Sequence, residues 1–408
     1  MSTHSTSLSY DSDFNPWSQP FCQTSVPSAV APPPPTPCLG TKHQYALRGT
    51  KGNVRPWLSL ILASRSPKPE LLPLFVGKDV ISGTVELDLP KPETIREVRI
   101  TIKGESTHLT QESSTFLEVS QTLASPSGKL SGQVSYPFKF VLPEDVTIYE
   151  SNWAMVYPVP PRFHEKGILY IDYKVVVTVR RGKFSGDNSL VSDFCYFPET
   201  TAERPSILRE KAYLNPTQSD IPTPMLDPGG WKLLPSVKAV LVPNTAVTLQ
   251  LSIANPLSFA LGTPIPLFLD VRNDEATYFD PESIDIRLVR ALVTRGLTGG
   301  VRKLDVARAM LWPAQGSSLH STKLWGEILV EKCLTPSFDF SNCSVRYSIV
   351  LYPRHTPDKS EREPLLSEEV LLTLHKAVGV VPRPQAPPGI IPRPIEHKRS
   401  VTTRSFFA

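Results

Sequence analysis

The sequence has few cysteines and no long hydrophobic run. Its cysteines are Cys22, Cys38, Cys195, Cys333 and Cys343, an odd set without a CxxC pair. A disulfide framework or a zinc site is therefore not expected, and a reducing compartment is the simplest setting. The amino terminus lacks the basic and apolar regions of a signal peptide, and the apolar run at 57–63 is far shorter than the roughly 20 residues that span a bilayer. We expect a soluble, intracellular protein.

The sequence also lacks a strong charge excess and the repeating pattern of amphipathic helices. The 43 Lys and Arg residues nearly balance the 39 Asp and Glu residues, which leaves a net charge of +4 at pH 7. This excess is too small to indicate a nucleic-acid partner. The 43 prolines disfavour a helical protein, because a proline inside a helix costs about 3 kcal/mol. Short strands joined by turns suit this composition.

Catalytic signatures are missing as well, since the chain has no HExxH, Walker-type, GxSxG or dinucleotide-binding glycine motif. These patterns carry the metal, phosphate or nucleophile chemistry of common enzyme classes. We therefore expect a protein that is not an enzyme and has neither cofactor nor metal. His164 and Glu165 are adjacent and would be the best acid–base pair, although a solvated turn is the simpler interpretation. An enzyme with an unrecognised site on the loops stays an alternative hypothesis.

The strongest pattern in the chain runs from 168 to 181. Every second position holds an apolar side chain, and these residues are Ile171, Tyr173, Val175, Val177 and Val179. β-branched and aromatic residues with a period of two predict a strand. The run exceeds the usual strand length of about 5–6 residues, so we expect a central strand paired on both edges.

Further strands fall into two series separated by the Pro- and Gly-rich stretch 204–235. Each series holds several short alternating runs at the spacing of a β-sandwich, and only 307–311 suggests a helical turn. The predicted fold is all-β, with two tandem antiparallel β-sandwiches of immunoglobulin-like type. The predicted parts are a disordered Ser/Thr/Pro-rich extension at 1–54, sandwiches at 55–203 and 236–377, a linker at 204–235, and a basic, Pro-rich, disordered tail at 378–408.

The order of several short segments resembles the arrestin superfamily, and most closely the fungal arrestin-domain proteins of the α-arrestin type. The resemblance covers about residues 56 to 378 and is strongest in the first series. The similar segments are 75–85, 136–143, 160–163 and 167–173 in the first series, and 254–257 and 262–267 in the second. The resemblance implies two arrestin-like domains in tandem.

Proteins of this type are adaptors that bind cytosolic parts of membrane cargo, such as transporters or receptors, and direct its endocytosis or sorting. The resemblance therefore implies a cytoplasmic protein peripheral to the plasma membrane or endosomes. Many such adaptors recruit HECT-type ubiquitin ligases through Pro-Pro-x-Tyr motifs, but this sequence contains none, and 191–193 lacks the arginine of a visual-type polar core. The same fold would also suit a structural subunit of a coat- or retromer-like sorting complex.

Basic residues near the end of the long strand are the candidate binding residues. Arg180, Arg181 and Lys183 follow one another closely, and Arg99 and Lys103 share an alternating strand that would extend the same face. Arginine presents a planar fork of donors that fits carboxylate or phosphate oxygens, so these residues would hold an acidic or phosphorylated cargo tail. The alternative is an ordinary hairpin whose charges keep the sheet edge soluble.

Two terminal features suggest further contacts. The basic carboxy-terminal tail would add attraction to anionic membrane lipid, worth about 1 kcal/mol per basic residue near the surface. The proline run at 32–37 favours a polyproline II conformation that aromatic grooves bind. Unstructured extensions are the alternative interpretation for both.

Overall fold

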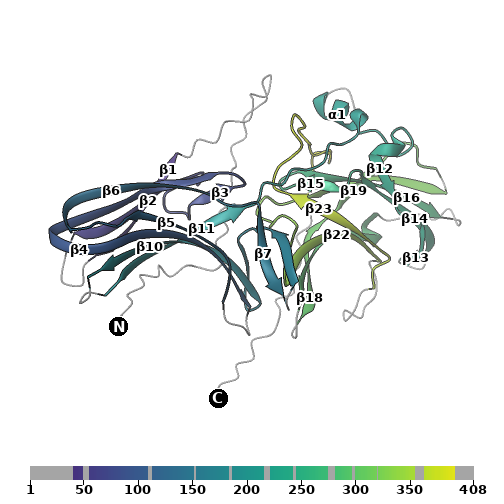
Figure 1. Cartoon of the computed structure of the whole chain (residues 1–408). Helices are drawn as coiled ribbons and strands as arrows, with labels where there is room; N and C mark the ends of the chain where they lie inside the picture. Colours follow the sequence, from purple (N-terminus) through teal and green to yellow (C-terminus); the bar gives the residue numbers. More distant parts are fainter. Residues whose placement is uncertain are drawn as a thin grey trace, which may run out of the picture. The chain divides into compact units, whose positions relative to one another are not determined.

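A computed structural model of the chain describes residues 40–48, 55–108, 113–150, 153–182, 186–215, 221–241, 245–273, 281–295, 299–318, 320–353 and 363–390. The described part is nearly all β-strand, with one α-helix among these residues. It divides into two compact units, one up to Glu199 and one from Thr200 (Figure 1). The prominence of strands confirms the all-β prediction.

Unit 1 contains a nine-stranded sheet and a separate hairpin. The hairpin consists of β7 (Asp145–Glu150) and β8 (Trp153–Pro158). The sheet consists of β1 (Thr41–Arg48), β2 (Pro56–Ser64), β3 (Leu74–Val76), β4 (Val80–His108), β5 (Ser114–Ala124), β6 (Lys129–Val141), β9 (Phe163–Glu165), β10 (Leu169–Arg181) and β11 (Asn188–Phe197).

The long strand β4 joins the two layers of this sheet. Its first half pairs with β2 and β6, and its second half pairs with β10 and β5. The pairing register with β6 shifts between Leu89 and Glu93, where two prolines interrupt the strand. Apolar side chains from both halves are buried, including Leu87 at 1% exposed and Ile100 at 0%. One strand therefore contributes to both sides of a sandwich-like core (Figure 1).

Strand β10 is the central strand that the sequence pattern predicts. It pairs antiparallel with β4 on one edge and with β11 on the other. The five alternating apolar residues, Ile171, Tyr173, Val175, Val177 and Val179, are all 0% exposed. Burying five large side chains on one face explains why this run is the strongest strand signal, because each contributes roughly 1.5–3 kcal/mol relative to exposure.

Unit 2 contains two six-stranded sheets. The first holds β12 (Trp231–Leu233), β13 (Val237–Leu241), β14 (Thr245–Ala254), β16 (Pro264–Asn273), β19 (Met310–Pro313) and β20 (Ser321–Leu329). The second holds β15 (Ser258–Ala260), β17 (Ile284–Thr294), β18 (Gly300–Arg308), β21 (Phe338–Phe340), β22 (Cys343–Pro353) and β23 (Leu366–Thr373). Apolar residues on alternate positions are fully buried, as at Leu251 and Ile349, which gives a sandwich-like core.

Several elements differ from the predictions. Most strand pairs are antiparallel, but β3 pairs parallel with β11, and β15 pairs parallel with β23. The predicted helical turn at 307–311 is wrong, because β18 ends at Arg308 and β19 begins at Met310. Alternation in these short, irregular strands was too brief to separate a strand from a turn of helix.

Two predicted unstructured segments contain ordered elements. Part of 1–54 forms β1, whose His43 is 1% exposed and bonds Ser64 at 2.9 Å. The predicted linker 204–235 contains β12, helix α1 (Ile207–Leu214) and the short 3-10 turn η1 (Pro228–Gly230). Outside the linker, a second such turn, η2 (Pro281–Ser283), precedes β17. The Ser206 hydroxyl caps α1 by accepting from the Arg209 N–H at 3.2 Å. Both segments were predicted to be unstructured because their composition is polar. Polar side chains with buried hydrogen-bond partners cannot be told from loop residues by composition.

The predicted basic tail also begins with an ordered part. Val380 is 5% exposed, and the backbone N–H of Gln385 donates to the Glu327 carboxylate at 2.8 Å. Val380 and Gln385 therefore attach this part of the tail to the rest of unit 2, contrary to the prediction of disorder. Residues 1–39 and 391–408, including the proline run at 32–37, lie outside the described residues.

Candidate ligand-binding face

The outward side of the β4–β10 layer in unit 1 carries most of the predicted binding residues. Because strand side chains alternate between faces, the buried Ile100 and Ile102 leave Arg99 and Lys103 on the opposite side. Arg99 lies opposite Thr178 of β10, and Lys103 lies opposite Lys174. We call this outward side the charged face.

Two arginines of the charged face converge on one carboxylate. Arg99 Nε donates to Glu97 Oε1 at 2.8 Å, and Arg180 Nη1 donates to Glu97 Oε2 at 3.1 Å. Thr122 Oγ1 also donates to Glu97 Oε1 at 3.0 Å. The hydrogen bond from Arg99, helped by the Thr122 hydroxyl and the charge of Arg180, lowers the pKa of Glu97. Two cations and one anion give this group an excess positive charge.

Both guanidiniums remain accessible to solvent. The Arg99 side chain is 41% exposed and the Arg180 side chain is 52% exposed, whereas Glu97 between them is only 13% exposed. Each guanidinium has five N–H donors, so donors remain beyond those that contact Glu97. The Arg99–Glu97–Arg180 group can therefore accept a further anion or exchange its carboxylate for one.

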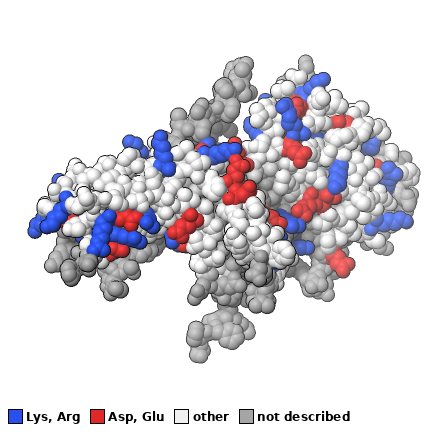
Figure 2. All heavy atoms as spheres, viewed as in Figure 1, with Lys and Arg blue, Asp and Glu red and all other residues white. Residues whose placement is uncertain are grey.

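The other predicted basic residues are distributed differently. Arg181 Nη1 binds Glu93 Oε2 at 3.0 Å, and its guanidinium lies 4.3 Å from the Trp57 ring centroid. Lys103 Nζ lies 3.6 Å from Glu118 Oε2, and Lys183 lies outside the described residues. The structure thus brings Arg99 and Arg180 together and separates Arg181 from them. Figure 2 shows basic and acidic side chains interspersed over the visible surface rather than one continuous basic patch.

A second polar group on the same layer was not anticipated. His164 Nε2 lies 2.7 Å from Asp172 Oδ1, and Arg162 Nη2 lies 3.1 Å from the same oxygen. Burial tends to raise the pKa of Asp172, but the His164 hydrogen bond and the Arg162 charge outweigh it, so the pKa is lowered. His164 therefore pairs with Asp172 rather than with the adjacent Glu165. The antiparallel pairing of β9 with β10 brings these residues together.

This second group is suited to holding the chain rather than to reacting. Arg162 and His164 both contact the Asp172 carboxylate, which fixes β9 against the start of β10. The nearby Cys195 thiol is 2% exposed, and burial raises its pKa. A buried thiol with a raised pKa supplies little thiolate. Among the described residues, no group of three or more His, Cys, Asp or Glu side chains is placed to hold a metal ion.

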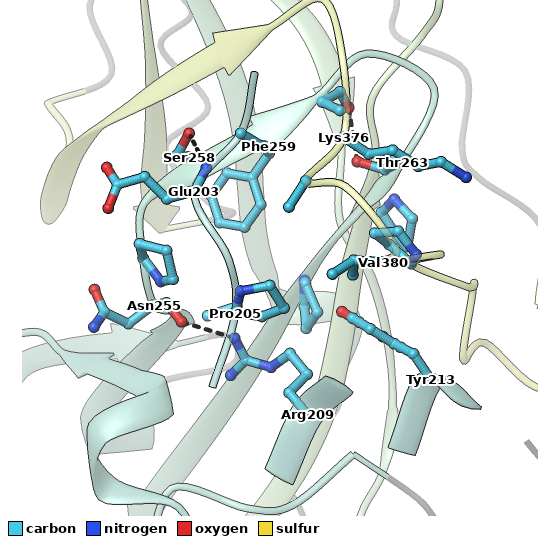
Figure 3. A pocket seen from close by; sticks show the side chains of 18 residues that line it. Glu203, Pro205, Arg209, Tyr213, Asn255, Ser258, Phe259, Thr263, Lys376 and Val380 are labelled. Atoms are coloured by element: carbon cyan, nitrogen blue, oxygen red, sulfur yellow. Dashed lines mark hydrogen bonds between the residues drawn. The ribbon is translucent and has the colours of Figure 1, made fainter. Parts of the chain in front are cut away.

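Unit 2 contains a small cavity beside helix α1 (Figure 3). Its volume is about 40 Å³, and Arg209, Tyr213 and Asn255 are among its lining residues. Arg209 is 2% exposed, lies 4.8 Å from the Trp231 ring centroid and donates to the Asn255 carbonyl at 3.1 Å. Burial lowers the pKa of this guanidinium. The space suits roughly one water molecule, so the cavity reflects how α1 attaches to the sheet.

No protein-family model matches this chain, and no curated protein matches it either. The described residues include no helix with the length and apolar character needed to cross a membrane.

Proposed function

We propose that this protein is an arrestin-like cytoplasmic adaptor. It would bind cytosolic segments of membrane cargo, such as transporters or receptors, at the plasma membrane or endosomes and direct their endocytosis or sorting. Two successive all-β units support this proposal, as do the arrestin-like segments, several of which lie on strands. The segment 75–85 spans β3 and the start of β4, and 262–267 leads into β16. Any link to a HECT-type ubiquitin ligase would need a contact other than Pro-Pro-x-Tyr.

The Arg99–Glu97–Arg180 group is the observation that carries the binding part of the proposal. Two partly exposed guanidiniums converge on a carboxylate with a charge of −1. A phosphoserine or phosphothreonine in a cargo tail carries about −1.5 to −2 and three acceptor oxygens. Such a phosphate would bind more strongly than the carboxylate that it replaces, because charge-assisted hydrogen bonds to arginine form in parallel. Salt would weaken this exposed contact, since the Debye length is about 8 Å at physiological ionic strength.

A binding experiment with synthetic peptides tests this part directly. The probe is a peptide with two phosphoserines, compared with the same peptide without phosphate. We expect the double variant Arg99→Ala, Arg180→Ala to bind the phosphopeptide at least about tenfold more weakly, the loss of about 1.4 kcal/mol. The control variant Arg272→Ala removes an arginine that is 64% exposed and pairs with Asp270 in unit 2, and it should bind normally. Equal binding by both variants would contradict the proposed site.

Cargo sorting needs its own test in cells. Proximity labelling by the full chain should recover transporters or receptors together with trafficking factors. Recovery of none of these would argue against an adaptor, even if a phosphopeptide binds the purified protein.

A structural subunit of a coat- or retromer-like complex is the second candidate function. The hairpin of β7 and β8 favours it, because Tyr149 is 80% exposed, Trp153 is 75% exposed and Val156 is 63% exposed. The hairpin register places Tyr149 and Val156 on one face and Trp153 on the other. Exposed apolar side chains, aromatic ones above all, are typical of protein interfaces. A stable stoichiometric complex, lost in the variant Tyr149→Ser, Trp153→Ser, would favour this function. Loose, cargo-dependent contacts would favour the adaptor.

A further inference from the structure

The outer face of the first sheet in unit 2 carries a row of aromatic side chains. Leu324 and Ile328 of β20 are 0% exposed and face the core between the sheets, so Trp325 between them faces outward. Trp325 lies opposite Trp312 of β19. Its ring centroid is 5.0 Å from Phe268. Trp312 and Trp325 of this row line a groove, and two neighbouring strands of one sheet hold them in place.

An open space of about 230 Å³ lies along this row. Trp312 and Trp325 line it together with Pro266 and Pro313. Gln385 and Pro387 of the chain's own ordered tail also line the space. We call this space, with its two tryptophans and two prolines, the tryptophan groove.

A buried carboxylate is among the lining residues of the groove. Glu327 is 2% exposed, and burial raises its pKa although backbone N–H groups of the tail lower it. Its Oε2 accepts from the Gln385 N–H at 2.8 Å, and the Ala386 N–H also contributes. Among the described residues, Oε1 has no hydrogen-bond partner. Burying a carboxylate is costly unless it is hydrogen-bonded, so its place here points to a role in binding backbone N–H groups.

The tail segment that reaches the groove has an unusual composition. Residues 381–388 read Val-Pro-Arg-Pro-Gln-Ala-Pro-Pro. Proline has no N–H, so Gln385 and Ala386 are the only neighbouring pair of N–H donors between the prolines. This is the pair that Glu327 binds. Upstream, Val380 is 5% exposed and anchors the segment beside α1, where Figure 3 shows it near Tyr213.

We propose that the tryptophan groove is a binding site for proline-rich peptides, and that residues 381–388 are its resident ligand in cis. Proline-rich chains favour an extended conformation that docks on aromatic grooves at low entropic cost. Glu327 adds a polar requirement for the bound peptide, because its carboxylate needs two adjacent backbone N–H donors, which follow a proline in the resident segment. The fitting partner is therefore an extended segment of another protein with the pattern Pro-x-x-Pro-Pro. This inference does not depend on the adaptor proposal.

The resident segment controls access to the groove. A tethered ligand acts at an effective concentration in the millimolar range, so a free peptide of the same sequence competes poorly with it. The segment also leaves about 230 Å³ of the groove open. A partner peptide that has a large apolar side chain in place of that of Gln385 would fill this space and would displace the resident segment more easily.

The decisive experiment uses the full chain with the groove vacated. The variant Pro384→Gly, Pro387→Gly, Pro388→Gly keeps Val380 but removes three prolines that favour the extended conformation, of which Pro387 lines the groove. A fluorescein-labelled peptide with the sequence of residues 380–390 is titrated into the wild-type chain and into this variant. We expect the variant to bind the peptide at least about tenfold more tightly, because the competitor in cis has been weakened. Equal affinity for both chains would overturn the proposal.

Two peptide analogues test the contact with Glu327 on the same folded protein. One has N-methyl groups at the positions of Gln385 and Ala386, which removes both N–H donors. The matched control has one N-methyl group at the position of Arg383. The first analogue should bind at least about tenfold more weakly than the control. If both bind equally, Glu327 does not select the peptide, and the proposal fails.

Hydrogen exchange in the wild-type chain provides a measurement that needs no variant. The Gln385 and Ala386 amides should exchange at least about tenfold more slowly than the Arg383 amide. An excess of the unlabelled peptide with phenylalanine in place of Gln385 should remove this protection. Equal exchange at all three amides, or protection that the peptide leaves unchanged, would show that the groove does not hold the segment as a ligand.

Discussion

The buried carboxylate of Asp285 makes a sharp test of how unit 2 holds its charges. Asp285 lies on β17 and is 1% exposed. Arg308 Nε binds its Oδ1 at 2.8 Å, and Arg287 binds its Oδ2. Arg287 also binds Asp305 of β18. Two cations and two anions therefore form one group at the edge of the core.

The change Asp285→Asn removes the most buried charge of this group and leaves both guanidiniums in place. Loss of one partner of a buried pair costs about 3–5 kcal/mol. Arg287 keeps Asp305, and the Arg287 and Arg308 side chains are 22% and 18% exposed, so we expect the lower end, about 3 kcal/mol. For a unit of this size, that loss corresponds to a fall in Tm of about 6–12 °C.

Thermal unfolding followed by tryptophan emission measures this effect. Unit 2 contains Trp231, Trp312 and Trp325, which are half of the chain's six tryptophans, so a large part of the signal reports on the unit that is changed. The control Asp339→Asn disrupts exposed pairs with Arg295 and Arg346, since the Asp339 side chain is itself 50% exposed, and it should cost at most about 1 kcal/mol. Equal shifts for the two variants would refute the reasoning that burial decides the cost.

Three further predictions concern packing, glycine and pH. Ile171→Ala should lower the unfolding free energy of unit 1 by about 2–5 kcal/mol, whereas Val191→Ala, 48% exposed, should change it by at most about 0.5 kcal/mol; urea titration measures both. Gly83→Ala should prevent normal folding, because its Cβ would lie 2.0 Å from a carbonyl oxygen of β2, while Gly128→Ala, with no atom within 4 Å, should fold normally as judged by circular dichroism. Folding raises the pKa of Glu327, so the unfolding free energy of the wild type should fall as pH rises from the unfolded pKa through the folded pKa. The unfolding free energy of Glu327→Gln should therefore increase relative to that of the wild type in urea titrations from pH 4 to pH 8. A constant difference between the two proteins would contradict this assignment.

Alternation of side chains made the sheet strands predictable from the sequence. It identified β10 and correctly placed Arg99 on the outward face, because residues of equal parity share one side of a strand. It could not predict that Arg99 and Arg180 share Glu97. Arg180 and Glu97 are 83 positions apart in the chain, and their contact depends on the register between β4 and β10.

Elements that bury polar groups escaped prediction for a different reason. His43 in β1 reads as a loop residue until its bond to Ser64 is known. The tail at 381–388 reads as disordered because prolines dominate its composition, and its anchor, Glu327, reads as an ordinary charge in a strand. In each case a hydrogen-bond partner distant in sequence offsets the cost of desolvating the polar group. A local sequence pattern does not show which distant residue is that partner.

The shared strand β4 has a consequence for how this chain can tolerate changes in length. A deletion of one residue within a strand turns every later side chain to the opposite face. Inside Val80–Leu89 or Ile95–His108, such a deletion would send the apolar set of one layer into solvent. The proline-containing irregularity between Leu89 and Glu93 is the place where an insertion or deletion could be absorbed, so length variation among natural or engineered variants should concentrate there.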